Sequence, residues 1–187
     1  LNLEFDYRPK ASLQKMRDAS ISVPFADIPF SPYKLTMSMF LAELLGYATR
    51  AEQQGDALFH FLMDSILWLD QAESNFSNFH IVFMIKLTAY LGFFPNIESG
   101  AGMDYFDLVD GCFVSAVPTH RNYLDAEDSM RMVHLLRLDY KTMHLYTMSR
   151  SDRNRCIEVL LLYYRIHLPS FPELKSYSVL KDMFSTM

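Results

Sequence analysis

The chain has 187 residues, half of them apolar and 21% charged, and its formal net charge is −5. This length suggests one domain of ordinary size, with enough apolar residues to form a core. The two cysteines, Cys112 and Cys156, are too few for a disulfide scaffold or a four-cysteine zinc site, and they fit a reducing, cytoplasmic setting. No apolar run is long enough to cross a membrane, and no secretory signal is visible.

The charge is distributed unevenly along the chain. Residues 40–130 carry 13 acidic residues and only three basic ones. Residues 139–187 carry seven basic and five acidic residues, and residues 1–39 carry five basic and four acidic residues. The chain is thus acidic in its middle and mildly basic at both ends. An ordinary solvated surface would give the same balance, so charge alone does not indicate a nucleic-acid partner.

The first 32 residues predict little regular structure. Residues 1–7 alternate between apolar and polar side chains, which predicts a half-buried strand. A single strand is not stable alone, and the chain supplies no obvious partner for it. A short helix is expected over residues 12–19, and Pro24, Pro29 and Pro32 mark a connector. Because the chain opens on this strand without an initiator methionine, we expect it to be a fragment of a longer protein.

Helical periodicity dominates the rest of the chain. The predicted helices cover residues 33–54, 58–69, 75–91, 125–138, 140–146, 151–168 and a last stretch that begins at 172. The helix over 75–91 is apolar on nearly all sides and is therefore expected to be buried. Asp125 is a favourable N-cap for the fourth helix. Between residues 105 and 114 the pattern changes to a small hairpin, because Asp110-Gly111 is a strong turn signal.

No catalytic or metal-binding constellation is visible in the sequence. The six histidines do not pair at helical spacing, and none lies in a Cys/His cluster, so no zinc site is expected. The chain has no Gly-x-Ser-x-Gly, no glycine-rich phosphate loop and no paired-glutamate metal motif. Cys156 lies in an apolar helix, where a core role outweighs that of a nucleophile. We therefore expect no enzyme, no cofactor and no metal.

A cluster of basic residues in the last third of the chain is the strongest remaining signal. Arg150, Arg153 and Arg155 lie at the positive end of a helix macrodipole, where acids are favoured and cations are not. Asp152 and Glu158 each lie three residues from Arg155 and would form local pairs with it. The alternative is a patch kept unneutralised so that phosphates dock there. The candidate phosphate contacts are Arg150, Arg153, Arg155, Arg165, Lys175 and Lys181.

Lys86 is a second candidate. It is the only basic residue between Arg50 and Arg121, and it lies in the apolar segment 82–87. A lysine in such a setting usually extends its ammonium group to a neighbouring carboxylate. The alternative is a receptor site for an acidic peptide tail with an apolar end, in which Lys86 meets the carboxylate of the peptide.

Several short motifs follow one another along the whole chain. They are Phe40-Leu41-Ala42-Glu43-Leu44-Leu45, Asn78-Phe79-His80 leading to Leu91-Gly92-Phe93-Phe94-Pro95, Tyr105-Phe106-Asp107 with Gly111-Cys112-Phe113, and Arg153-Asn154-Arg155 through Tyr163-Tyr164 to Leu174-Lys175-Ser176 and Leu180. In this order and spacing they resemble the family of the bacterial DNA repair protein RecO. The resemblance implies an N-terminal OB-fold followed by a mainly α, multi-helix C-terminal domain. Residues 1–20 would then be a remnant strand and linker of the OB-fold, and residues 21–187 the helical domain, with its hairpin at about 105–115.

The resemblance also implies a function. Such proteins are non-enzymatic mediators that bind single- and double-stranded DNA, anneal complementary strands and help to load RecA onto coated single strands. The partners implied are DNA, RecR, the acidic C-terminal tail of the single-stranded-DNA-binding protein and, indirectly, RecA. The localisation implied is the cytoplasm, at the nucleoid, with no membrane contact. Many members carry four zinc cysteines in the region matching 95–115, whereas this chain has only Cys112 there, so no zinc is expected. The alternative function is a structural or protein-interaction domain that does not contact DNA.

Overall fold

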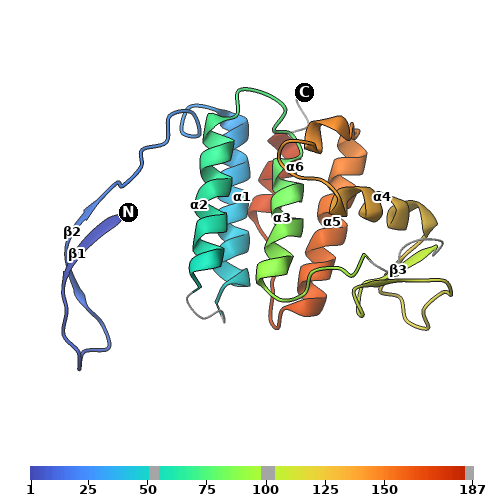
Figure 1. Cartoon of the computed structure of the whole chain (residues 1–187), viewed down its shortest axis with the longest axis horizontal. Helices are drawn as coiled ribbons and strands as arrows, with labels where there is room; N and C mark the ends of the chain where they lie inside the picture. The colour runs from blue at the N-terminus through green and yellow to red at the C-terminus, as the bar shows by residue number, and fades with distance from the viewer. Residues whose placement is uncertain (51–54, 98–103, 184–187) are drawn as a thin grey trace.

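The computed structural model describes residues 1–50, 55–97 and 104–183. Within these described ranges, six α-helices form the body of the molecule, and a two-stranded hairpin extends from it at one end (Figure 1). The helices are α1 (Pro32–Ala48), α2 (Asp56–Gln71), α3 (Phe79–Tyr90), α4 (Ala126–Leu136), α5 (Arg150–His167) and α6 (Ser176–Met183), and a short 3-10 helix, η1 (Met143–Leu145), precedes α5. The predicted mainly α fold is confirmed.

Helix α3 lies at the centre of the helical body. It packs against α2, α4 and α5, while α6 packs against α1. Residues 79–85 are all buried, as the apolar pattern predicted. Two adjacent tyrosines of α5 complete this core: Tyr163 and Tyr164 are almost fully buried, and their hydroxyl groups donate to the carbonyl oxygens of Phe93 and Met84. Each buried hydroxyl therefore has a partner, which removes the cost of burying it.

Side chains cap the N-termini of α4 and α5. Asp125 caps α4 as predicted, since its side chain accepts a hydrogen bond from the N–H of Asp128. Ser149 and Asp152 form a capping box at the start of α5. Helix α3 begins at Phe79, four residues later than expected, because Asn75 has a φ of +63°, which a right-handed helix does not accept. The predicted end of the first helix, at residue 54, lies outside the described residues.

A small antiparallel sheet covers the other end of the molecule. It has the order β4-β3-β5, with β3 at Tyr105–Asp107, β4 at Cys112–Val114 and β5 at Tyr123–Leu124. The predicted hairpin is confirmed, but its first strand ends at Asp107 instead of continuing to Val109. The carboxylate of Asp107 accepts the N–H groups of Val109 and Asp110 and so starts the turn early. The two-residue strand β5 was not predicted.

The prediction for the N-terminal residues is wrong in two respects. Residues 12–19 do not form a helix: strand β2 (Lys15–Ser20) pairs antiparallel with β1 (Asn2–Asp6). The first strand therefore has the partner that the sequence did not reveal. Pairing between segments outweighs weak local helix propensity, and the side chain of Gln14 closes the loop by bonding the backbone of Arg8 and Ala11. The assignment of residues 1–20 to an OB-fold stays a prediction.

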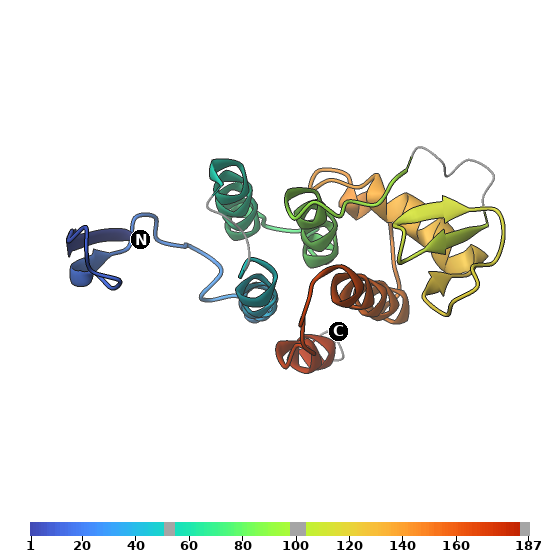
Figure 2. The ribbon, with the colours of Figure 1, turned by 90° about the horizontal axis from the view of Figure 1, so that it is seen from below.

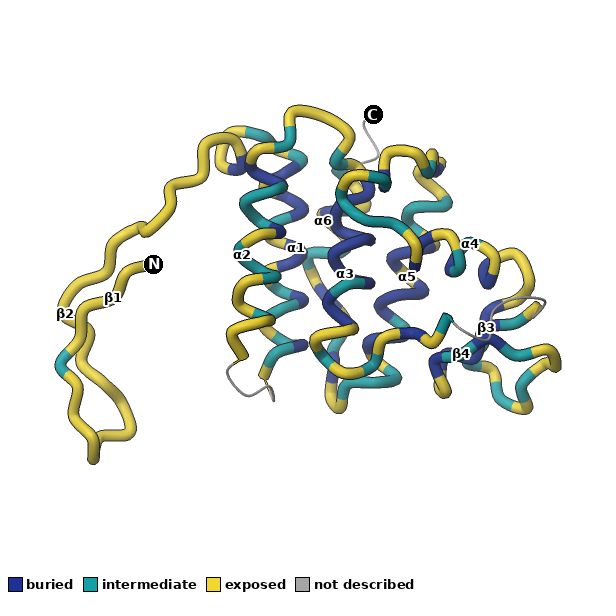
Figure 3. The backbone as a smooth tube through the Cα atoms, viewed as in Figure 1, coloured by how far each residue is buried: buried dark blue, intermediate teal, exposed yellow. Residues whose placement is uncertain are grey.

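The connector between the hairpin and the body is fixed at one point. The carboxylate of Asp70, at the end of α2, accepts the backbone N–H groups of Ala26, Asp27 and Ile28 at 2.8–3.0 Å. Lys34, only 1% exposed, donates to the backbone carbonyl of Asp70 and forms a 2.6 Å ion pair with Asp27. Both strands of the hairpin remain exposed, as Figure 3 shows.

Candidate functional site

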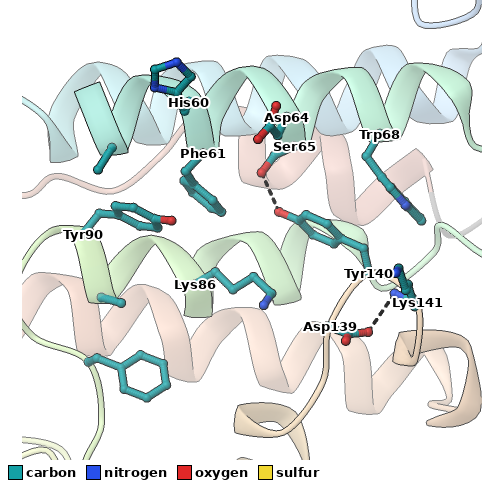
Figure 4. A pocket seen from close by; sticks show the side chains of 13 residues that line it. His60, Phe61, Asp64, Ser65, Trp68, Lys86, Tyr90, Asp139, Tyr140 and Lys141 are labelled. Atoms are coloured by element: carbon teal, nitrogen blue, oxygen red, sulfur yellow. Dashed lines mark hydrogen bonds between the residues drawn. The ribbon is translucent and has the colours of Figure 1, made fainter. Parts of the chain in front are cut away.

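A pocket of about 800 Å³ lies between α2, α3 and residues 139–141 (Figure 4). Its walls are mainly apolar and include several aromatic rings. The aromatic residues that line it are Phe61, Trp68, Tyr90, Phe94 and Tyr140. Pockets of this size with apolar walls and a few polar groups are typical of ligand sites.

Two sets of stacked rings build these walls. The ring of Tyr140 stacks on Trp68 and on Phe79, at centroid distances of 5.2 and 5.0 Å. Phe61 stacks on Tyr90 at 4.6 Å. The Tyr140 hydroxyl donates to Ser65 Oγ at 2.8 Å, and burial raises the pKa of this hydroxyl far above its ordinary value. Tyr140 is therefore a neutral, fixed wall of the pocket.

Lys86 is the basic side chain that α3 contributes to this pocket. Its Nζ atom lies 6.0 Å from the centre of the Tyr140 ring, and Figure 4 shows it directed toward Tyr140 and Asp139. Hydrogen bonds from Thr142 lower the pKa of the Asp139 carboxyl, and the charge of Lys86 lowers it further. Both interpretations of Lys86 thus have a structural counterpart: a carboxylate lies near it, and it lines a pocket with an apolar wall.

The arginines at the start of α5 do not form one patch. Arg155 donates two hydrogen bonds to one oxygen of Asp128 in α4, at 2.8 and 2.6 Å. Arg153 is half-buried and donates to the Oδ1 atom of Asn78 at 3.1 Å, and desolvation lowers the pKa of its guanidinium group. Arg150, in contrast, extends toward α6. The three side chains therefore meet three different parts of the fold.

The remaining basic candidates lie on α5, on α6 or just before α6. A guanidinium nitrogen of Arg150 lies 3.4 Å from the backbone carbonyl oxygen of Lys181. The ammonium group of Lys181 pairs with Glu158 at 3.4 Å. Arg165 lies near the C-terminus of α5 and pairs at 3.6 Å with the exposed Glu173, and Lys175 is exposed just before α6. The exposed ion pairs of Arg165 and Lys181 contribute little in water, about 0–1 kcal/mol each.

Sequence reasoning missed Arg131 and the aromatic wall of the pocket. Arg131 contacts Glu127, Asp128 and Asp152. Asp152, which the sequence analysis paired with Arg155, is thus a partner of Arg131. The spacing between Arg131 and Glu127 was a visible signal, because residues four apart face each other on a helix. No local signal links Tyr140 to Lys86, because the two residues are far apart in the sequence and come together only in the folded chain.

The described part of the chain shows neither a metal-ligand cluster nor a membrane-spanning helix. There, no group of three or more His, Cys, Asp and Glu side chains is placed to hold a metal ion. Cys112 and Cys156 are both thiols. Within the same residues, every helix is too short or too polar to span a bilayer.

Comparison with known proteins gives a consistent result. Residues 29–177 match the family model described as Recombination protein O C terminal. The chain is 45% identical to the DNA repair protein RecO of Phocaeicola vulgatus over 185 residues, which cover 99% of this chain and 77% of that relative. It is 43% identical to the DNA repair protein RecO of Bacteroides fragilis, and the match covers 98% of this chain and 76% of that relative. No solved structure matches the chain.

Proposed function

Because this chain belongs to the RecO family of DNA repair proteins, we propose that it is the helical domain of a recombination mediator that acts by binding and not by catalysis. In this proposal it binds single- and double-stranded DNA, supports the annealing of complementary strands and helps to load RecA onto coated single strands. Its direct partners are DNA, RecR and the C-terminal tail of the single-stranded-DNA-binding protein, in the cytoplasm at the nucleoid.

The pocket around Lys86 is the observation that best supports this function. A tail that ends in an apolar residue would place that side chain against Trp68, Tyr140 and Phe61, where it is shielded from water. Its terminal carboxylate would meet the Lys86 ammonium group in a charge-assisted hydrogen bond. Lys141, at the edge of the same pocket, supplies a second cation for acidic residues that precede the end of the tail.

Peptide titration tests this site. An acidic peptide with a C-terminal phenylalanine is titrated against the wild-type chain and the Lys86→Ala variant by fluorescence anisotropy. A hydrogen bond to a charged group contributes about 1.5–3 kcal/mol, so the variant is expected to bind at least roughly tenfold more weakly. Arg137→Ala, an exposed cation outside the pocket, serves as the matched control. Equal affinities of wild type and Lys86→Ala would remove Lys86 from the peptide site.

DNA contact is proposed for the basic residues of α5 and α6. The proposed contacts are Arg150, Arg153, Arg155, Arg165, Lys175 and Lys181. The exposure of five of these side chains and the weak pairs on α6 support this assignment. The tighter bonding of Arg155 and the half-burial of Arg153 favour the alternative for those two residues, in which they hold the fold together. A domain that binds only proteins is thus the second candidate function, and oligonucleotide binding separates the two.

A further inference from the structure

We propose that Asp139 determines which acidic ligands the pocket around Lys86 accepts. Its carboxylate competes with the carboxylate of a bound peptide for the Lys86 ammonium group, so that an acidic ligand stays bound only when an apolar residue also fills the pocket. This inference rests on the proposed function and adds to it a residue that sets the selectivity of the peptide site. Both side chains line the pocket, and Figure 4 shows Lys86 directed toward Asp139.

The charges that line the pocket cancel one another. Besides His60, the charged side chains in the lining are two lysines, Lys86 and Lys141, and two aspartates, Asp64 and Asp139. A site that captures acids by charge alone needs a surplus of cations, because only then does its potential attract anions. Among the described lining residues the lysines do not outnumber the aspartates, so the apolar walls must supply much of the binding free energy of an acidic ligand.

The carboxylate of Asp139 is held in place by its own turn of the chain. Its Oδ1 atom accepts hydrogen bonds from the N–H of Lys141 at 2.8 Å, the N–H of Thr142 at 2.7 Å and the Thr142 hydroxyl at 2.9 Å. The Thr142 Oγ1 atom in turn accepts the N–H of Asp139 at 3.0 Å. Such a turn fixes the side chain relative to the backbone. The segment between α4 and α5 passes beside α3 (Figure 2), so a ligand at Lys86 meets the carboxylate in a fixed position.

Asp139 carries a charge that acts on Lys86, although the two side chains form no ion pair. Hydrogen bonds from Thr142 and Lys141 and the charge of Lys86 lower the pKa of the Asp139 carboxyl, so this group is ionised at neutral pH. Lys86 is half-buried, and its Nζ atom lies 6.0 Å from the centre of the Tyr140 ring. The ammonium group is therefore attracted by Asp139 but remains accessible to a ligand in the pocket.

A ligand carboxylate at Lys86 brings a second anion next to Asp139. The two anions repel each other and share one ammonium group, so the ligand gains less from Lys86 than it would if Asp139 were neutral. This cost applies to any acid, whereas an apolar end packed against Trp68, Tyr140 and Phe61 offsets it. Acidic side chains and phosphates without an apolar anchor are thus rejected by an unfavourable interaction, which is a general route to specificity.

The test titrates two peptides against the wild-type chain and the Asp139→Asn variant by fluorescence anisotropy. Both peptides are acidic and end in phenylalanine, one with a free C-terminal carboxylate and the other with a C-terminal amide. Asparagine keeps the Oδ1 acceptor of the turn and removes the charge. Because water partly screens the repulsion, the variant is expected to bind the carboxylate peptide at least roughly threefold more tightly than the wild type does, and the amide peptide less than about twofold more tightly.

Two further variants serve as controls. Asp182→Asn makes the same charge change at an exposed position on α6, outside the pocket, and should leave both affinities within about twofold of the wild-type values, because distant exposed charges are screened. Asp139→Ser, whose hydroxyl can also accept hydrogen bonds within the turn, should reproduce the gain and replaces Asp139→Asn if that variant does not fold.

The wild type alone tests the need for an apolar anchor. The same acidic peptide ending in alanine should bind at least roughly tenfold more weakly than the one ending in phenylalanine, because less apolar surface is buried. Equal affinities of these two peptides would contradict the inference. So would a carboxylate peptide that binds wild type and Asp139→Asn equally, or an equal gain for the carboxylate and amide peptides, and the peptide site would then remain without this role for Asp139. A wild type that binds neither phenylalanine-ended peptide overturns the proposed peptide site itself.

Discussion

The guanidinium group of Arg155 bonds a single carboxylate oxygen of Asp128 through two of its nitrogens, at 2.8 and 2.6 Å. This interaction joins α5 to α4. The carboxylate is buried, whereas the Arg155 side chain remains 51% exposed. A residue that the sequence offered as a phosphate contact thus also neutralises an acid that would otherwise be buried beside Arg131 alone.

Removing Arg155 should therefore destabilise the fold. We expect Arg155→Ala to lower the free energy of unfolding by about 1–2 kcal/mol, because it removes one of two cationic partners of a buried carboxylate, and the exposure of the arginine limits the loss. Urea unfolding followed by circular dichroism measures the change. Arg165→Ala is the matched control, since its partner Glu173 is exposed, and it should cost less than about 0.5 kcal/mol. Equal losses for the two variants would show that the ion pair with Asp128 stabilises the fold no more than an exposed ion pair does.

The exposed cations near α6 should instead act on DNA affinity. Replacing Lys175 and Lys181 by alanine should flatten the salt slope of oligonucleotide binding by roughly 0.7–0.9 for each phosphate that the variant no longer neutralises. The free energy of unfolding should change by less than about 1 kcal/mol, because the pair between Lys181 and Glu158 is exposed. Anisotropy titrations from low to moderate salt give the slope. A slope that stays at the wild-type value would exclude these two lysines from the DNA-binding surface.

Local signals explain the parts of the fold that the sequence predicted well. The cap at Asp125 and the Asp110-Gly111 turn each depend on residues within a few positions, so α4 and the β3–β4 hairpin were visible. Strand β2 was not, because its pairing with β1 is decided between segments. The same holds for the sites. Lys86 was found as a lone cation in an apolar segment, but Tyr140 comes beside it only in the folded chain.

Asp70 should make stability depend on pH. Burial raises the pKa of its carboxyl, but hydrogen bonds from the backbone of Ile28, Ala26 and Asp27 and the charge of Lys34 outweigh burial, so that the pKa lies below its ordinary value. A lowered pKa means that the stabilisation is present above the unfolded-state pKa of about 3.9 and is lost as the pH falls through the folded-state value.

The variant Asp70→Asn isolates this contribution. It should be less stable than the wild type at pH 7, and the difference should shrink as the pH is lowered below about 4, where the wild-type carboxyl becomes protonated. Chemical denaturation over a range of pH values measures both differences. Glu73→Gln, an exposed carboxyl shortly after α2, is the control and should leave the pH profile almost unchanged. A constant difference between Asp70→Asn and the wild type at every pH would contradict the role of the charge.

Gly111 should tolerate no side chain while Tyr163 is present. It has a φ of +63°, and a Cβ atom at this position would lie 2.6 Å from the Tyr163 hydroxyl oxygen. That hydroxyl donates to the carbonyl of Phe93 at 2.9 Å, so it cannot move without breaking the hydrogen bond. We expect Gly111→Ala to cost about 2–4 kcal/mol in the free energy of unfolding, of which the backbone conformation contributes about 1–2 kcal/mol.

A double-mutant cycle separates the clash from the backbone strain. Tyr163→Phe removes the hydroxyl and should cost about 1 kcal/mol, because the hydrogen bond to Phe93 is then missing. Adding Gly111→Ala to that background should then cost only the backbone part, so the two losses should sum to more than the loss of the double variant. Urea unfolding of the four proteins gives the coupling. Strict additivity would mean that the ring moves aside freely, and the packing between α5 and the β3–β4 turn would then be looser than the distance implies.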